Sequence, residues 1–130
     1  MRDGRTHRVA STQDPGDFLT RHRASLTRID GPASGAEHEL DGARLLIGRS
    51  RSAGIHLDER SVSHEHASLE LGAGGFAIRD LASTNGLRIN GQPVDSRALE
   101  HGDRIQIGSC ELQYVVEPRT VQRSWRLRTA

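Results

Sequence analysis

Residues 67–81 read ASLELGAGGFAIRDL. The first five residues alternate apolar and polar side chains with a period of two, which is typical of a half-buried strand. The glycine-rich segment 72–75 is turn material, and residues 76–81 form a second apolar run. The stretch therefore predicts a β-hairpin.

Similar short runs lie on both sides of this hairpin. Asp41-Gly42 and Asn90-Gly91 each separate two neighbouring runs, and such dipeptides favour tight hairpin turns. An all-β chain of about ten to eleven short strands joined by tight turns predicts an antiparallel β-sandwich. The other runs predicted as strands are Ser25–Ile29, Glu37–Leu40, Arg44–Ile47, Gly54–Leu57, Leu87–Ile89, Pro93–Val94, Arg104–Ile107 and Cys110–Val116.

The length of 130 residues suits one domain with a real core. We expect a disordered leader at 1–24, the sandwich at 25–118 and a basic tail at 119–130. Residues 25–118 contain nine Arg and fourteen Asp or Glu, a net charge of −5, whereas the leader carries +2 and the tail +4. A net acidic domain does not offer the positive face that duplex nucleic acid needs, so we expect no nucleic-acid partner.

Cysteine and lysine usage exclude several kinds of site. Cys110 stands alone, which excludes an internal disulfide and a cysteine-based zinc site. All eighteen basic side chains are Arg, so lysine catalysis is excluded as well. No apolar stretch approaches the roughly 20 residues of a membrane span. We therefore expect a reducing, cytoplasmic setting without a membrane partner.

Three short motifs carry groups that bind anions. A guanidinium is a rigid fork of donors that fits phosphate. Hydroxyl and amide groups on neighbouring loops can donate to the remaining oxygens of the same phosphate. Taken singly, each motif also has a plain interpretation as a surface turn. The motifs are Gly48-Arg49-Ser50, Ser63-His64-Glu65-His66 and Ser83-Thr84-Asn85-Gly86.

The order and spacing of the three motifs resemble those of a forkhead-associated (FHA) domain, from roughly Ser25 to Pro118. The resemblance implies an FHA/SMAD-like β-sandwich that binds phosphothreonine peptides. It also implies that Arg49 is the principal phosphate contact with Ser50 beside it, and that the Ser63 hydroxyl binds phosphate. His66 would brace the binding loops from behind.

The third motif has implied roles in the same resemblance. Thr84 would line the phosphothreonine pocket and Asn85 would hydrogen-bond the peptide main chain. Gly86 would allow the loop its conformation, as Gly48 would allow the close turn before Arg49.

Position 64 departs from the family pattern, which often has Arg or Lys just after the serine. Here the residue is His64. An imidazolium would bring a positive charge to a phosphate that carries roughly −1.5 to −2 at pH 7, so phosphate binding would then depend on pH. The alternative is a solvated His64 that does not contact the ligand.

Three other kinds of site have weaker support. His56, His64, His66 and Asp80 could contribute to a metal site, but they lack a recognised ligand spacing. Residues 72–77 match a dinucleotide-binding pattern that should open a helix, and here they lead into a strand. Ser, His and Asp all occur, but without the elbow motif of a hydrolase. We expect neither an enzyme nor a bound cofactor.

These observations predict a phosphothreonine-binding adaptor in Ser/Thr kinase signalling. Its partner would be a phosphothreonine-containing protein, such as a Ser/Thr kinase or a substrate of one. The alternative is a scaffolding domain that keeps the fold and binds without phosphate. Thr12 in the leader is the best internal candidate for phosphorylation and for an intramolecular contact with the site.

Overall fold

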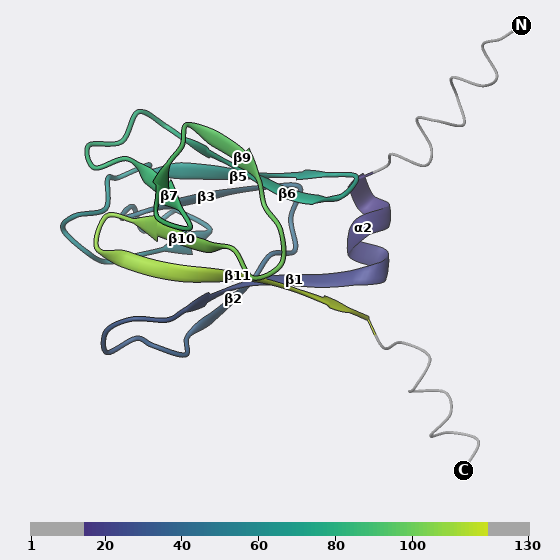
Figure 1. Cartoon of the computed structure of the whole chain (residues 1–130). Coiled ribbons are helices and arrows are strands. Elements are labelled where there is room, and N and C mark those ends of the chain that lie inside the picture. The colour runs from purple at the N-terminus through teal and green to yellow at the C-terminus, as the bar shows by residue number, and fades with distance from the viewer. Residues whose placement is uncertain (1–14, 120–130) are drawn as a thin grey trace, which may run out of the picture.

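The computed structural model describes residues 15–119, which form two β-sheets packed face to face with one short helix at an end (Figure 1). The predicted antiparallel β-sandwich is confirmed. The six-stranded sheet has the order β2-β1-β11-β10-β7-β8. Its strands are β1 (His22–Arg28), β2 (Glu37–Glu39), β7 (Leu87–Ile89), β8 (Gln92–Pro93), β10 (Arg104–Ile107) and β11 (Cys110–Pro118).

The second sheet has five strands in the order β4-β3-β5-β6-β9. Its β3 and β4 run parallel, and its other neighbours are antiparallel. The hairpin predicted at 67–81 lies at its centre, with Gly72 paired to Gly75 across the turn. The strands are β3 (Arg44–Gly48), β4 (Ile55–His56), β5 (Ala67–Gly72), β6 (Gly75–Asp80) and β9 (Ser96–Ala98).

The two predicted hairpin dipeptides behave differently. Asn90 and Gly91 both have positive φ values, 52° and 84°, and join β7 to β8 as predicted. Asp41-Gly42 does not close a hairpin, because β2 pairs with β1 in one sheet and β3 pairs with β5 in the other. Leu40 is fully buried and its N–H donates to the Ala24 carbonyl, so the chain crosses between the sheets after this residue.

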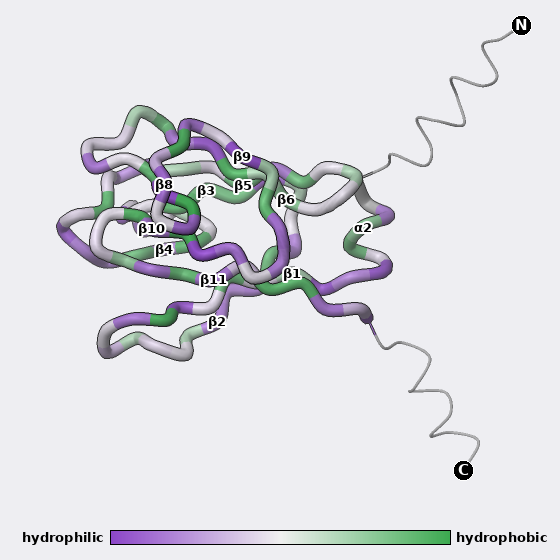
Figure 2. Tube along the Cα trace, viewed as in Figure 1, coloured by the Kyte–Doolittle hydropathy of each residue, from purple (hydrophilic) through white to green (hydrophobic). Residues whose placement is uncertain are grey.

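The core between the sheets is mainly aliphatic. Alternate residues of β7, β10 and β11 point inward, as Ile105 and Ile107 of β10 do, and Figure 2 shows hydrophobic stretches along β1 and β3. Tyr114 is fully buried, and its hydroxyl accepts a hydrogen bond from the Phe76 N–H at 3.1 Å. Burial raises the pKa of the Cys110 thiol, which belongs to the same core.

The prediction of a disordered leader up to residue 24 fails for residues 15–24. Residues Pro15–Arg21 form helix α2, and β1 begins at His22. Phe18 is only 8% exposed and stacks on the His22 ring at 4.7 Å, so the helix covers the end of the core. Residues 1–14, which include Thr12, and residues 120–130 of the predicted tail lie outside the described residues.

The end of β11 is tied to this helix. The Arg119 N–H donates to the Arg21 carbonyl at 2.9 Å, and the Arg119 Nε donates to the Leu19 carbonyl at 2.7 Å. Both ends of the described chain therefore lie at the end of the sandwich that α2 covers (Figure 1).

Phe18→Ala should lower the free energy of unfolding by about 3 kcal/mol, because it removes a buried ring and leaves a cavity beside Gly75. Arg21→Ala is the control on the same helix. Its side chain is exposed and, among the described residues, pairs with Asp17 alone, so the change should stay within about 0.5 kcal/mol. Urea denaturation of both variants measures the difference, and equal small losses would show that α2 does not stabilise the sandwich.

Candidate functional site

The three sequence motifs lie on the β3–β4, β4–β5 and β6–β7 loops, at the end of the sandwich opposite α2 (Figure 1). The first two loops are joined by main-chain bonds: the Arg49 N–H donates to the Ser63 carbonyl at 3.0 Å, and the Ser50 N–H donates to the His64 carbonyl at 3.1 Å. This approach requires Gly48, since a Cβ there would overlap the carbonyl oxygen of His64.

Arg49 is exposed at the rim of the site. Its Nε donates to the Val62 carbonyl at 3.0 Å, which fixes the direction of the guanidinium. Among residues 15–119 it has no carboxylate within ion-pair distance. The terminal NH groups of Arg49 therefore keep their charge and their donors for a ligand.

Ser63 links the second motif to the third. Its hydroxyl oxygen accepts a hydrogen bond from the Thr84 N–H at 3.0 Å. The hydroxyl hydrogen is still available to donate, as a phosphate oxygen would require. Thr84 is exposed beside it.

His66 is fully buried behind these loops. Its Nδ1 accepts the Ser63 N–H at 3.0 Å, and its Nε2 lies 2.8 Å from the Gly86 carbonyl. Because a carbonyl can only accept, the imidazole must carry its proton on Nε2 and be neutral. This geometry fits the bracing role expected for His66.

The β6–β7 loop is held by two side chains that sequence reasoning did not assign to the site. The Asp80 carboxylate accepts the Ser83 hydroxyl at 2.5 Å and the Ser83 N–H at 3.2 Å. The Ser83 oxygen in turn accepts the Gly86 N–H at 2.9 Å. The sequence indicates Asp80 only as a possible metal ligand, although Asp side chains commonly hydrogen-bond nearby main-chain groups in turns.

Ser61 is a further residue that sequence reasoning missed. Its carbonyl accepts from the Asn85 Nδ2 at 2.8 Å, which leaves the Asn85 Oδ1 available. Its hydroxyl donates to the Ser109 Oγ at 2.9 Å and accepts the Ser109 N–H at 2.7 Å. The β10–β11 turn thus supports the site from 48 residues away, and no local signal in the sequence indicates this contact.

The base of the β4–β5 loop is anchored by Arg28 on β1. This guanidinium is nearly buried and lies 2.6 Å from Asp30 and 3.7 Å from Glu59. Burial alone would raise the pKa of the Asp30 carboxyl, but hydrogen bonds from Arg28 and from the Glu111 N–H hold it below its usual value. The contact with Glu59 fixes the loop four residues before Ser63.

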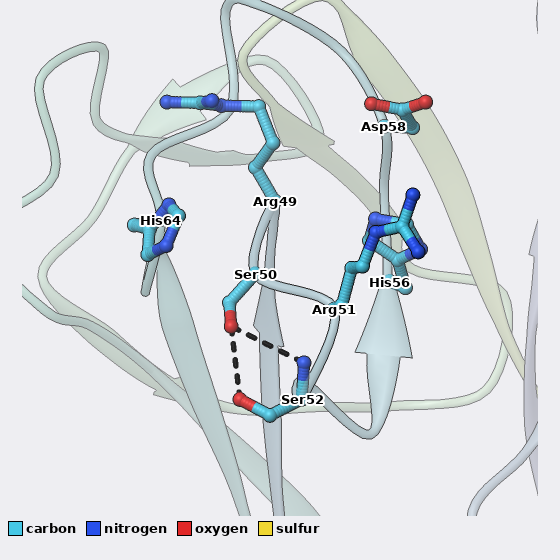
Figure 3. A pocket seen from close by; sticks show the side chains of 7 residues that line it. All are labelled: Arg49, Ser50, Arg51, Ser52, His56, Asp58 and His64. Carbon is cyan, nitrogen blue, oxygen red and sulfur yellow. Dashed lines mark hydrogen bonds between the residues drawn. The ribbon is translucent and has the colours of Figure 1, made fainter.

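A cleft of about 590 Å³ opens beside Arg49 (Figure 3). His64 is exposed and lines it, as its predicted role requires. Ser50 also lines it, but its hydroxyl shares a 2.9 Å hydrogen bond with Ser52, so it is partly engaged within its own loop. The lining residues are Arg49, Ser50, Arg51, Ser52, His56, Asp58 and His64.

The metal alternative has no geometric support in the described part of the chain. Across residues 15–119, no three His, Cys, Asp or Glu side chains are arranged to hold a metal ion. His66 uses both ring nitrogens on the loops. No helix within the same range is long and apolar enough to cross a bilayer.

Comparison with known proteins adds a family profile and several relatives. The profile, described as "Inner membrane component of T3SS, cytoplasmic domain", matches residues 28–117. Glycogen accumulation regulator GarA of Mycolicibacterium smegmatis is 38% identical over 90 residues, which are 69% of this chain and 57% of that protein. The aligned part thus spans little more than half of that relative.

Two further matches cover a larger share of the matched protein. The oxoglutarate dehydrogenase inhibitor of Corynebacterium efficiens is 38% identical over 102 residues, 78% of this chain and 72% of that protein. A structure from a study of phosphothreonine-dependent FHA domain interactions superposes with a TM-score of 0.69 at 30% identity. That superposition covers 75% of this chain and 99% of the other.

His66→Ala should lower the free energy of unfolding by about 3 kcal/mol, because the Ser63 N–H and the Gly86 carbonyl both lose a buried partner. His64→Ala is the matched control: the side chain is exposed, and its loss should cost less than about 0.5 kcal/mol. Chemical denaturation separates the two variants. Similar losses for both would contradict the bracing role.

Ala82→Gly should stabilise the protein by about 0.5–1 kcal/mol. Ala82 has φ 55°, a left-handed conformation that costs a side-chain-bearing residue roughly 1–2 kcal/mol and glycine little. Ala77→Gly, at an exposed position of β6, is the control and should destabilise by about 0.5–1 kcal/mol. Thermal unfolding of both variants measures the two changes, and changes of the same sign would contradict the cost assigned to the left-handed conformation of Ala82.

Proposed function

The chain belongs to the forkhead-associated (FHA) family, and we propose that it binds phosphothreonine peptides as a non-enzymatic adaptor. The sandwich would hold the peptide in extended form across its loop end. Two named relatives, a regulator and an inhibitor, support a regulatory role rather than catalysis.

One observation carries the proposal: within residues 15–119 the Arg49 guanidinium has no carboxylate partner, and its Nε is held by the carbonyl of Val62, the residue before Ser63. The Ser63 carbonyl in turn accepts the main-chain N–H of Arg49. These contacts hold the two loops together before a ligand binds, so neither loop needs to rearrange when phosphate arrives. A fixed, uncompensated cation with a hydroxyl donor on the adjoining loop suits a phosphate dianion. Preorganisation of this kind lowers the entropic cost of binding.

The other proposed roles follow from the groups that the loops leave available. The methyl group of Thr84 would shape a pocket for the phosphothreonine methyl. The free Asn85 Oδ1 would accept a main-chain N–H of the peptide, since its Nδ2 already donates to Ser61. His64 would add a donor, or a positive charge when protonated, on the cleft side of Arg49.

The partner that this chemistry selects is a protein phosphorylated on threonine, so the adaptor would act downstream of a Ser/Thr kinase. The intramolecular contact through phosphorylated Thr12 stays a prediction, as does the cytoplasmic setting. The alternative of phosphate-independent scaffolding predicts that an unmodified partner binds equally well.

Arg49→Ala should weaken binding of a phosphothreonine peptide by about 10- to 150-fold, since a hydrogen bond to a charged group contributes roughly 1.5–3 kcal/mol. The fold should be kept, because the side chain is exposed. Titration calorimetry measures the affinity of the wild-type protein and of the variant for one phosphothreonine peptide and for the same peptide without phosphate. A peptide selected from an oriented phosphothreonine library provides the ligand.

Arg97→Ala is the control for this substitution. Arg97 is an exposed arginine on β9 that does not line the cleft, so its loss changes the net charge equally and should leave affinity within about twofold. Equal binding of the phosphorylated and unphosphorylated peptides would instead favour the scaffold.

A further inference from the structure

The cleft beside Arg49 has a second side that phosphate binding does not use. Figure 3 shows Arg49 and His64 on one side, and Arg51, His56 and Asp58 on the other. Ser63 does not line this cleft, so a phosphate held by Arg49 and Ser63 would lie at its Arg49 edge. The second side therefore faces whatever follows or precedes the phosphothreonine.

Arg51 carries an uncompensated charge on that second side. It is exposed, and within residues 15–119 no carboxylate lies in ion-pair distance of it. Arg23, Arg28 and Arg44, in contrast, each lie within 4.0 Å of a carboxylate. Other described arginines, such as Arg97, also lack a carboxylate partner, but Arg51 lies in the cleft, where its charge attracts anions.

The loop presents Arg51 in a defined turn. The Ser50 hydroxyl accepts the Ser52 N–H at 3.2 Å, and the Ser50 carbonyl accepts the Ala53 N–H at 3.1 Å. Ala53 is buried, which anchors the far end of the turn. Arg51 lies at the corner of this turn, so little main-chain ordering is needed when it meets a ligand.

The carboxylate of Asp58 limits how much negative charge a ligand can carry on the second side of the cleft. Its carboxylate lines the same cleft as Arg51 and His56. With a neutral imidazole, the three groups sum to about zero charge, whereas a second phosphate would bring roughly −1.5 to −2. A carboxylate with a single charge meets less repulsion there.

We propose that Arg51, with His56, binds an aspartate or glutamate side chain that flanks the phosphothreonine of the same peptide. The inference rests on the proposed function, because Arg49 must first hold the phosphate. It makes Arg51 a specificity-determining residue, and Asp58 the group that disfavours a second phosphate.

The test compares phosphothreonine peptides that carry Asn or Asp at each flanking position in turn, by fluorescence anisotropy at low ionic strength. At the position that reaches Arg51, Asp should bind the wild-type protein about two- to fivefold tighter than Asn, as expected for an exposed ion pair. Phosphoserine at that position should gain less than Asp. Arg51→Ala should abolish the gain and leave affinity for the all-Asn peptide within twofold.

Two further variants sharpen the result. Asp58→Asn should enlarge the gain from Asp, and should enlarge the gain from phosphoserine most. Arg97→Ala should leave the gain unchanged. A wild-type protein that binds the all-Asn peptide but gains nothing from Asp at any position would overturn this inference alone.

Other outcomes also decide the question. If Arg51→Ala weakens the Asn and Asp peptides equally, the residue contributes only general charge and the inference is wrong. If phosphoserine gains more than Asp in the wild-type protein, the carboxylate assignment is wrong. If the all-Asn phosphopeptide does not bind at all, the proposed function fails and this inference fails with it.

Discussion

The loop end of the sandwich depends on one buried side chain, the imidazole of His66. It lies at the entrance to β5, where its own N–H donates to Ile47 and its carbonyl accepts from Leu81. From this fixed point the two ring nitrogens hold the β4–β5 and β6–β7 loops together. Hydrogen bonds of this kind are strengthened by the low dielectric of the interior, and breaking one leaves a costly unpaired group.

Hydrogen bonds hold these loops in place because the loops bury too little apolar surface to be held by packing. Arg49, Thr84 and Asn85 are exposed, so the segments that carry them bury little apolar area. Polar contacts take that place: those of Ser61 and Ser63 link positions that are separate in the chain, and that of Asp80 holds the turn within one loop. The aliphatic core below provides the stability, and the polar layer above it provides the shape.

The sequence predicted the features that depend on local pattern. The hairpin at 67–81 and the Asn90-Gly91 turn follow from period-two alternation and turn chemistry, and both were found. Helix α2 was missed because one buried residue, Phe18, fixes a short polar helix without a repeating apolar face. Asp41-Gly42 was misread because turn propensity does not reveal whether the next strand joins the same sheet.

The sequence predicted where the site lies, and the roles of its individual residues stay predictions. The three motifs converge on one end of the sandwich, as expected, but the support from Ser61 was not visible in the sequence. This support requires glycine at position 108, because a Cβ there would lie 2.5 Å from the Ser61 carbonyl oxygen. A close approach between residues 47 positions apart produces no repeating pattern in the sequence. The engagement of Ser50 with Ser52 is likewise a property of the folded loop.

The contact between Arg119 and helix α2 has a consequence for how this sandwich can be joined to other chains. The polypeptide enters the described domain at one end of α2 and leaves it beside the other end, and both points lie at the end of the sandwich away from the loops. Such a layout allows a domain to be inserted into a surface loop of a host protein, or to be circularly permuted with a short connecting segment. In either arrangement the loop end would still point outward.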